Sequence, residues 1–277
     1  MKKFNNLLFT LIACLLSISF IGCGSNISNS SSGESIDNSS NGEKPQIELI
    51  ISAAASLKEA MADIQTEYSK AHPEVTLTFN FGASGSLQKQ IEQGAPCDLF
   101  ISAGQSQMKA LYDEGLLEQD TDKDLVKNQL VLIGPKGTEL TSINDLSSDS
   151  VKHIASGEPS SVPAGKYADE VLTNMNLKDS LYDKLTFAKD VKEVLAWTVS
   201  GNAEAGFVYK SDALNSDGAQ IIEILPEDSH SPITYPVAVI KDSKNMNASK
   251  EFEDFLFSDT CKAIFEKYGY EMAKNIT

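Results

Sequence analysis

The sequence predicts an α/β fold in which mixed, mainly parallel sheets are flanked by helices. Short apolar runs rich in β-branched residues recur along the chain, and segments with helical spacing of apolar residues lie between most of them. The turns that lead from strand to helix share a composition of small residues. Strands that alternate with helices are typical of α/β proteins. A chain of 277 residues can form one large unit or two closely joined lobes.

The first 22 residues have the pattern of an export signal. Lys2 and Lys3 form a positive start, and a short apolar stretch follows over residues 7–21. We therefore expect these 22 residues to be a signal peptide that is removed from the mature protein.

The sequence FIGC closes this signal at Cys23. It resembles the lipobox of bacterial lipoproteins, although Phe20 stands where Leu is more usual. The resemblance implies that Cys23 is lipidated and anchors the protein to the outer side of the cell membrane. Secretion with a nearby cleavage site is the alternative. Residues 23–45 consist largely of Ser, Asn and Gly, which predicts a flexible tether.

The charge balance excludes some classes of partner. The chain contains no Arg, and removal of Lys2 and Lys3 leaves 21 Lys against 39 acidic residues, a net charge of −18. Such an acidic chain is a poor candidate for binding nucleic acid or a bare anionic membrane surface. An anionic ligand would have to be held by groups within its binding site rather than by the overall charge of the protein.

Two cysteines, Cys97 and Cys261, lie beyond the signal, which is too few for a disulfide framework. We expect two buried free thiols, with a single bridge as the alternative.

The predicted strands are, in order, residues 47–52, 75–81, 98–103, 130–134, 153–156, 184–188, 205–209, 220–225 and 235–240. Two helices are marked by apolar faces, one by Leu57, Ala60, Met61, Ile64 and Tyr68, the other by Val191, Val194, Leu195, Thr198 and Val199. Further helices are expected after the turns GASGS (82–86) and GEPSSVPAG (157–165).

The strand-to-helix turns are candidate parts of a binding site. In open α/β sheets these turns lie at the carboxyl ends of strands, where ligands bind. Small side chains, as in SAAAS (52–56) and GASGS, let a ligand approach the backbone. Each helix N-terminus offers unpaired N–H groups and the positive end of a dipole. Several such ends together would form an anion site.

Two serines in these turns are candidates with alternative roles. Ser56 and Glu59 have the S-x-x-E spacing of a capping box, and a capping hydroxyl keeps its proton for a ligand. Ser84 could cap the following helix or bind a ligand.

Three other positions are candidates. Ala164 follows Pro163, which is favoured in a first helical turn, and could donate only its backbone N–H. Val191 also stands at a helix start, where its side chain suits the core. Tyr209 ends a strand and could pack in the core or donate its phenol.

Ordered motifs over residues 46–270 resemble the molybdate-binding solute receptors of ABC transporters, of the periplasmic-binding-protein type. The motifs are AAASL, FGASGSL, GAPCDLFISA, GEPSSVPAGKYA, DVKEVLAW, FVYKSDA, PEDSHSPITYPVAV and FEKYGY. The resemblance implies a two-lobed type II fold whose ligand lies in the cleft between the lobes. Lobe I would comprise residues 46–128 and 236–277, and lobe II residues 129–235.

The resemblance also implies a set of oxyanion ligands. Hydroxyl and backbone groups of Ser56 and Ser84, the backbone N–H groups of Ala164 and Val191, and the Tyr209 phenol would hold molybdate or tungstate. The metal would thus be bound as its oxyanion, with no cofactor and no catalytic residue. Expected partners are the oxyanion and a membrane permease, with the receptor a monomer.

This sequence departs from the family pattern at three positions. Gly82 and Gly85 flank the second serine where relatives often carry Ala or Ser, and Cys97 replaces a small residue. None of these changes removes a donor.

Other functions remain as alternatives. The receptor could take another oxyanion such as sulfate, or a metal ion, although clustered metal ligands are not evident in the sequence. A hydrolase is less favoured, because GASGS lacks the second Gly of the G-x-S-x-G elbow, and His72, His153 and His230 have no partner at motif spacing. A structural surface lipoprotein would leave the small-residue turns unexplained.

Overall fold

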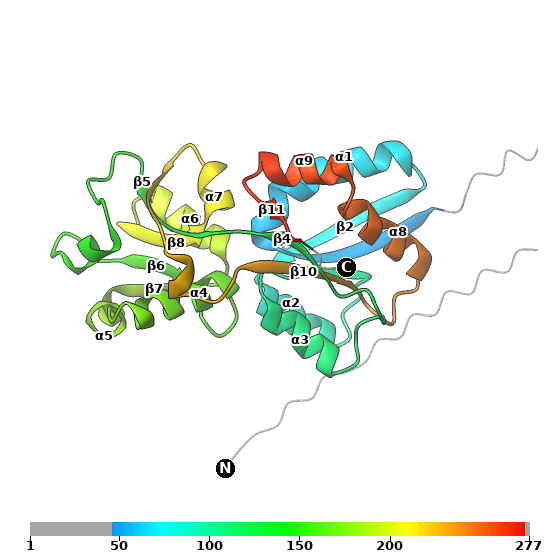
Figure 1. Ribbon diagram of the computed structural model, residues 1–277, viewed down its shortest axis with the longest axis horizontal. Helices are drawn as coiled ribbons and strands as arrows, with labels where there is room; N and C mark the ends of the chain where they lie inside the picture. Colours follow the sequence, from blue (N-terminus) through cyan, green and yellow to red (C-terminus); the bar gives the residue numbers. More distant parts are fainter. Residues whose placement is uncertain (1–45, 275–277) are drawn as a thin grey trace, which may run out of the picture. The chain divides into compact units, whose positions relative to one another are not determined.

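The computed structural model describes residues 46–274. The predicted signal peptide, Cys23 and the tether therefore lie outside the described residues. Within 46–274, none of the helices is long and apolar enough to cross a membrane. The described part contains two mixed sheets flanked by helices (Figure 1). The α/β class and the mixed sheets are confirmed. The expectation that the sheets are mainly parallel is wrong, because only four of the nine strand pairings among residues 46–274 are parallel.

The first sheet has the strand order β11-β4-β10-β3-β1-β2. Its strands are β1 (Ile47–Ala54), β2 (Val75–Gly82), β3 (Leu99–Ile101), β4 (Lys123–Lys127), β10 (Thr234–Val239) and β11 (Glu271–Met272). Strand β1 is parallel to both β2 and β3. The pairings of β10 with β3 and β4, and of β11 with β4, are antiparallel. The antiparallel strands are thus those next to the connections between the sheets and at the C-terminal end.

Helices cover both faces of the first sheet (Figure 1). They are α1 (Lys58–Ala71), α8 (Met246–Leu256) and α9 (Asp259–Lys267) on one face, and α2 (Ser84–Glu92) and α3 (Gln105–Asp113) on the other. Successive side chains of a strand point to opposite faces. Accordingly, Leu99 and Ile101 belong to the larger apolar core, whereas Phe100 packs with the residues of α2 and α3.

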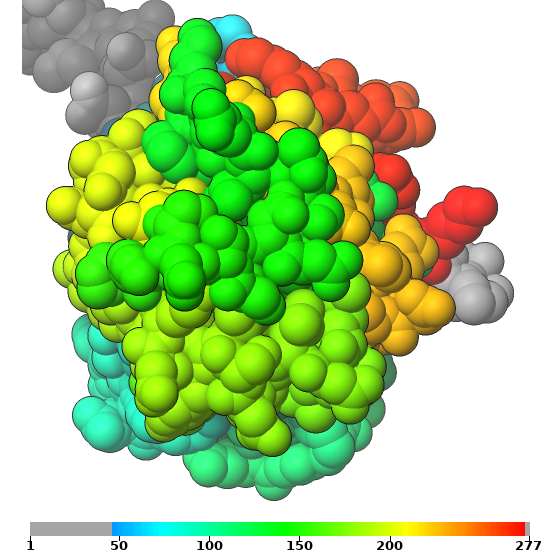
Figure 2. Space-filling view, turned by 90° about the vertical axis from the view of Figure 1, so that its left-hand side faces the viewer, coloured from blue at the N-terminus to red at the C-terminus, as the bar shows by residue number. Residues whose placement is uncertain are grey.

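The second sheet has the order β7-β6-β8-β5-β9. Its strands are β5 (Leu130–Pro135), β6 (Ile154–Gly157), β7 (Leu185–Ala188), β8 (Ala205–Tyr209) and β9 (Ala219–Ile224). Strand β6 is parallel to β7 and β8, whereas β5 is antiparallel to β8 and β9. The helices are α4 (Pro163–Asn174), α5 (Lys178–Leu181), α6 (Val191–Val199) and α7 (Lys210–Leu214). Figure 2 shows the surface of this end, built mainly from the green and yellow-green segments of the second sheet.

Four short 3₁₀ turns complete the described elements: η1 (Ala55–Leu57), η2 (Ile143–Ser147), η3 (Tyr182–Lys184) and η4 (Glu227–Ser229). Of these, η1 joins β1 directly to α1.

Two segments connect the sheets. Asn128 and Gln129 join β4 to β5, and the chain returns between Ile224 and Thr234. Thr234 pairs with Lys127, so the two connections lie side by side where they reach the first sheet. That the two parts are lobes with the predicted boundaries, and that they move about these connections, stays a prediction.

All nine predicted strands are present, with small shifts at their ends. The sequence pattern missed β4 and β11, because KDLVK is short and largely polar and β11 has only two residues. Cys97 and Cys261 are buried free thiols, as predicted.

Candidate functional site

A narrow cavity lies where the starts of η1, α2, α4 and α6 come together. All five residues proposed from the sequence line it: Ser56, Ser84, Ala164, Val191 and Tyr209. The remaining wall is formed by Ala54, Ala55, Gly82, Ala83, Ala103, Val162, Pro163 and Asp190. The volume of this cavity is about 10 Å³, so its walls lie close together. Most of these side chains are small, which leaves backbone N–H groups near the surface of the cavity.

Ser56 does not cap helix α1, so the capping-box prediction is wrong. The residue lies inside the 3₁₀ turn η1, and the N-cap of α1 is Leu57, which makes no side-chain capping bond. The Ser56 hydroxyl instead lies 3.0 Å from the hydroxyl of Tyr235. Glu59, the other half of the expected box, accepts a hydrogen bond from Lys192 Nζ at 2.7 Å. Tertiary partners have therefore replaced the local ones.

Ser84 is the first residue of α2, and the N-cap of that helix is Ala83. Ser84 is almost completely buried, and its Oγ accepts a hydrogen bond from the backbone N–H of Ala103 at 2.9 Å. A hydroxyl has one proton and two acceptor lone pairs. Because Ala103 uses an acceptor position, the Ser84 proton is available for donation into the cavity.

Helices α4 and α6 each present their first turn to the cavity. Pro163 occupies the first turn of α4 as predicted, with the buried Ala164 next to it. Val191 begins α6, whose N-cap Asp190 accepts a hydrogen bond from the backbone of Glu193 at 2.9 Å. The first N–H groups of a helix have no intrahelical acceptor, and they lie at the positive end of its dipole. Ala164 and Val191 occupy such positions.

Tyr209 ends strand β8 and is 1% exposed. Its hydroxyl donates a long hydrogen bond of 3.5 Å to the carbonyl of Ala103, and its ring packs edge-on against Tyr235 with centroids 5.6 Å apart. Burial raises the pKa of Tyr209 well above its usual value, so the phenol keeps its proton at neutral pH. Tyr209 is therefore both a core residue and a potential donor.

No lysine lines the cavity within the described part of the chain. Lys192, which follows Val191 in the sequence, is directed away to two carboxylates: its Nζ lies 2.7 Å from Glu59 Oε2 and 2.9 Å from Asp212 Oδ1. Asp212 is fully buried, and burial raises its pKa although Lys192 opposes the shift. Glu59, Lys192 and Asp212 are far apart in the chain and match no motif, so the sequence pattern did not indicate this cluster.

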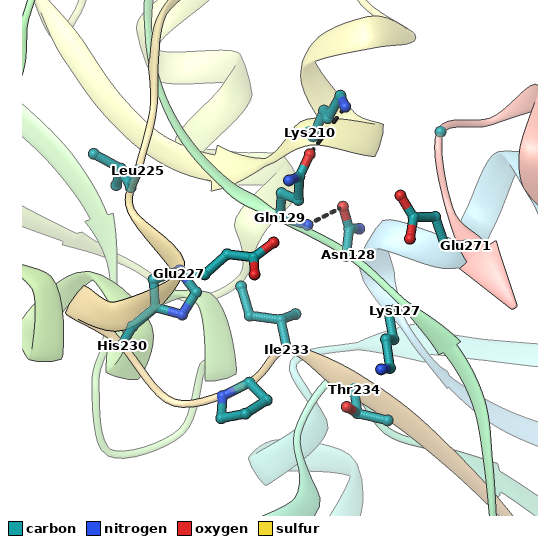
Figure 3. A pocket seen from close by; sticks show the side chains of 12 residues that line it. Lys127, Asn128, Gln129, Lys210, Leu225, Glu227, His230, Ile233, Thr234 and Glu271 are labelled. Carbon is teal, nitrogen blue, oxygen red and sulfur yellow. Dashed lines mark hydrogen bonds between the residues drawn. The ribbon is translucent and has the colours of Figure 1, made fainter. Parts of the chain in front are cut away.

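A second, larger cavity of about 310 Å³ lies beside the two connections (Figure 3). Asn128 and Gln129 line it from one connection, and Lys210 Nζ donates to Gln129 Oε1 at 2.9 Å. Glu227, from the other connection, and Glu271, from β11, add two carboxylates to the lining of this cavity. None of the five predicted residues lines this cavity. Its mixed charge makes it a poorer candidate for an anion than the narrow cavity.

The three histidines lie in separate places. His72 stacks on Tyr68, His153 is exposed at the start of a strand, and His230 lies near Tyr167. The Ser84 hydroxyl bonds to a backbone N–H rather than to a histidine. Among residues 46–274, we find no group of three or more His, Cys, Asp or Glu arranged to hold a metal ion.

The two mixed sheets, and the cavity formed by helix starts from both, define an α/β solute receptor. Residues 49–271 match the family model of bacterial extracellular solute-binding proteins, and the chain belongs to this family. The family consists of solute-binding receptors.

Two individual proteins and one solved structure show which members of this family the chain is similar to. The chain is 44% identical over 227 residues to YvgL of Bacillus subtilis, a lipoprotein assigned as an ABC transporter substrate-binding protein, covering 81% of this chain and 86% of YvgL. It is 38% identical over 232 residues to the molybdate-binding protein ModA of Escherichia coli, covering 80% and 88% of the two chains. A solved substrate-binding domain from Clostridium difficile, assigned to a molybdenum ABC transporter, is 64% identical with a TM-score of 0.66, covering 83% of this chain and 100% of that one.

Proposed function

We propose that this protein binds molybdate, and also tungstate, outside the cytoplasm and delivers it to the permease of an ABC importer. One observation carries the proposal: Ser56, Ser84, Ala164, Val191 and Tyr209, chosen from the sequence, line a single cavity. The relatives named for molybdate support the same ligand. In this proposal the protein is a receptor and not an enzyme.

Neutral donors are sufficient for such a ligand. Hydrogen bonds to a charged group contribute about 1.5–3 kcal/mol each. Several that converge can exceed the costs of ordering and desolvation and give micromolar to nanomolar affinity, about 8–12 kcal/mol. A wall of donors also selects by protonation, because a full dianion accepts at every oxygen whereas hydrogen phosphate carries a proton that needs an acceptor. We therefore expect phosphate to bind poorly.

The ligand would join two lobes, residues 46–128 with 236–277 and residues 129–235. Ser56 and Ser84 belong to the first, and Ala164, Val191 and Tyr209 to the second. Closure about the two connections would be stabilised by contacts that the ligand makes only in the closed form. The closed receptor, a monomer held at the membrane by a lipid on Cys23, would then present its ligand to the permease.

A titration of Trp197 fluorescence tests the proposal. Trp197 is the single tryptophan and lies in α6, the helix that starts at Val191. We expect strong responses to molybdate and tungstate, a weak one to sulfate and almost none to phosphate. If equilibrium dialysis of the ligand-stripped protein retains neither molybdate nor tungstate, the proposal fails.

The same measurements separate the alternatives. A sulfate receptor would reverse the order of the oxyanions in the titration. A metal-ion receptor would give heat with divalent cations and none with molybdate in calorimetry. Turnover of a generic ester that is lost in Ser84→Ala would indicate a hydrolase.

A further inference from the structure

We propose that Asn128 and Tyr235 form a one-way hydrogen-bond relay that turns the proton of the Ser56 hydroxyl into the oxyanion cavity. This inference rests on the proposed function, and it adds two residues that set the donor direction of the site. Neither residue lines the narrow cavity.

The relay begins at the side-chain amide of Asn128, on the connection between β4 and β5. Asn128 Oδ1 accepts a hydrogen bond from the backbone N–H of Gln129 at 2.8 Å, which Figure 3 shows as a dashed line. This bond identifies the oxygen of the amide and leaves Nδ2 as a pure donor. The two Nδ2 protons are directed to Ser211 Oγ at 2.9 Å and to the Tyr235 hydroxyl at 3.4 Å.

The middle of the relay is Tyr235 on β10, the strand that follows the second connection. The side chain is fully buried, and burial raises the pKa of Tyr235 well above its usual value. The phenol therefore stays neutral and has one proton to donate. Because Asn128 Nδ2 can only donate, the Tyr235 oxygen accepts on that side. Its proton is then directed to Ser56 Oγ at 3.0 Å. The Tyr209 hydroxyl also interacts with the Tyr235 hydroxyl, but its own proton is directed to the Ala103 carbonyl.

The relay ends at Ser56. Once its oxygen accepts from Tyr235, the remaining Ser56 proton is free to donate into the cavity. The Tyr270 hydroxyl donates to the backbone carbonyl of Ser56 at 2.7 Å and also interacts with the Ser56 and Ser211 side chains. Ser84 is oriented in the same sense by a single contact, the N–H of Ala103. Both serines thus have an acceptor position filled by the protein, one directly and the other through the relay.

This arrangement predicts how the site rejects protonated oxyanions. If Ser56 offers only a proton, hydrogen phosphate has no acceptor for its own proton at this position. Removal of the Tyr235 hydroxyl would let the Ser56 hydroxyl rotate and offer a lone pair instead. Molybdate would then lose a fixed donor, while phosphate would gain an acceptor. The two affinities should change in opposite directions, which a general loosening of the fold would not produce.

The test compares Tyr235→Phe with Tyr270→Phe by calorimetry at pH 8, with molybdate and inorganic phosphate as probes. Both variants remove a buried phenol hydroxyl bonded to Ser56, but the first removes the partner of the Ser56 hydroxyl and the second removes the donor to the Ser56 carbonyl. For Tyr235→Phe we expect molybdate to bind about tenfold more weakly, the equivalent of one hydrogen bond, and phosphate to bind more tightly than in the wild type. Tyr270→Phe should keep the wild-type ratio of the two dissociation constants.

A second variant covers the case in which Tyr235→Phe fails to fold. Asn128 is only half-buried. Asn128→Ala removes the donor that fixes the direction of the Tyr235 proton. The ratio of the molybdate and phosphate dissociation constants should therefore change in the same direction as in Tyr235→Phe, by a smaller factor. An unchanged ratio in the folded relay variants, with molybdate still bound tightly by the wild type, would overturn the relay and leave the proposed function standing. Loss of molybdate binding in the wild type itself would instead remove the proposed function.

Discussion

The backbone N–H of Gly85 donates a hydrogen bond of 3.0 Å to the carbonyl of Ser161, across the space between the two sheet-bearing parts. A Cβ atom at Gly85 would lie 2.6 Å from that oxygen, closer than real Cβ contacts. Gly85 therefore allows the first turn of α2 to meet the loop before α4. In the sequence, this glycine appeared only as a departure from the family pattern.

Gly85→Ala should therefore weaken molybdate binding by tenfold or more. The added methyl group would keep the two parts from reaching this contact, so the ligand would lose donors on one side, and one lost charge-assisted hydrogen bond alone is worth about 1.5–3 kcal/mol. Trp197 fluorescence titration measures the change. Ser86→Ala, at an exposed position in the same turn, is the control and should bind as the wild type does. Normal affinity in Gly85→Ala would show that this close approach is dispensable.

Ser56→Ala and Ser84→Ala should each raise the dissociation constant for molybdate about ten- to a hundredfold, because each removes one donor to a charged ligand. Both residues are small and buried, and the thermal midpoint should move by only a few degrees. Isothermal calorimetry and thermal unfolding measure the two effects. Ser106→Ala, an exposed serine in α3, is the matched control. Tight binding by both site variants would contradict the assignment of these hydroxyls.

The two carboxylate partners of Lys192, Asp212 and Glu59, should differ in their roles. We expect Asp212 to affect the free energy of unfolding and Glu59 to affect the rate of ligand release. Lys192→Met leaves the buried carboxylate of Asp212 without its cation, and we expect a loss of about 3–5 kcal/mol in the free energy of unfolding. Lys192→Met combined with Asp212→Asn should recover most of that loss. Denaturant unfolding measures both, and an unaltered midpoint in the single variant would show that the ion pair contributes little.

Glu59→Gln removes only one carboxylate partner of Lys192, the one on α1, which packs on the first sheet. Glu59 is partly exposed, so the free energy of unfolding should change by less than about 1 kcal/mol. The pair joins α1 to α6 next to the cavity, and we expect release of molybdate to become a few times faster. Stopped-flow fluorescence checks this rate. An equal release rate in the variant and the wild type would mean that the pair does not hold the closed form.

Glu253 should make stability depend on pH. Its side chain is 2% exposed, and burial raises its pKa to about 7 although Lys123 lies 3.3 Å away and opposes the shift. The pKa in the folded state exceeds that in the unfolded state, so the contribution is complete below the unfolded value and is lost as pH rises through about 7. Gln does not titrate, so Glu253→Gln should not lose this stability. The free energy of unfolding of Glu253→Gln minus that of the wild type should therefore increase by about 3 kcal/mol between pH 4.5 and 8.

Denaturant titrations of both proteins at several pH values provide the measurement. Glu266→Gln, at an exposed position in α9, is the control and should run parallel to the wild type. If the free energies of unfolding of Glu253→Gln and the wild type differ by the same amount across this pH range, the raised pKa of the buried Glu253 carboxyl is contradicted.

Much of the fold could be predicted because periodicity is a local property. Alternating and helical patterns indicated nine of the eleven strands among residues 46–274 and four of the helices, α1, α2, α4 and α6. Small residues in the turns indicated where a ligand could approach the backbone. Strands β4 and β11 escaped detection because sheet pairing, rather than their own composition, makes them strands. The capping box at Ser56 failed for a related reason: the local motif was present, but distant partners took both of its side chains.

The sequence by itself determined the α/β class, nine of the strands and the five residues that line one cavity, because these follow from patterns within a few residues of one another and from an ordered family resemblance. Only the tertiary structure decided which way the Ser56 hydroxyl faces, why residue 85 is glycine, and which carboxylates surround Lys192. Those features depend on contacts between segments brought together from up to 179 positions apart, as Ser56 and Tyr235 are. No spacing rule along the chain encodes such contacts, because they arise from the packing of the two sheets and their connections.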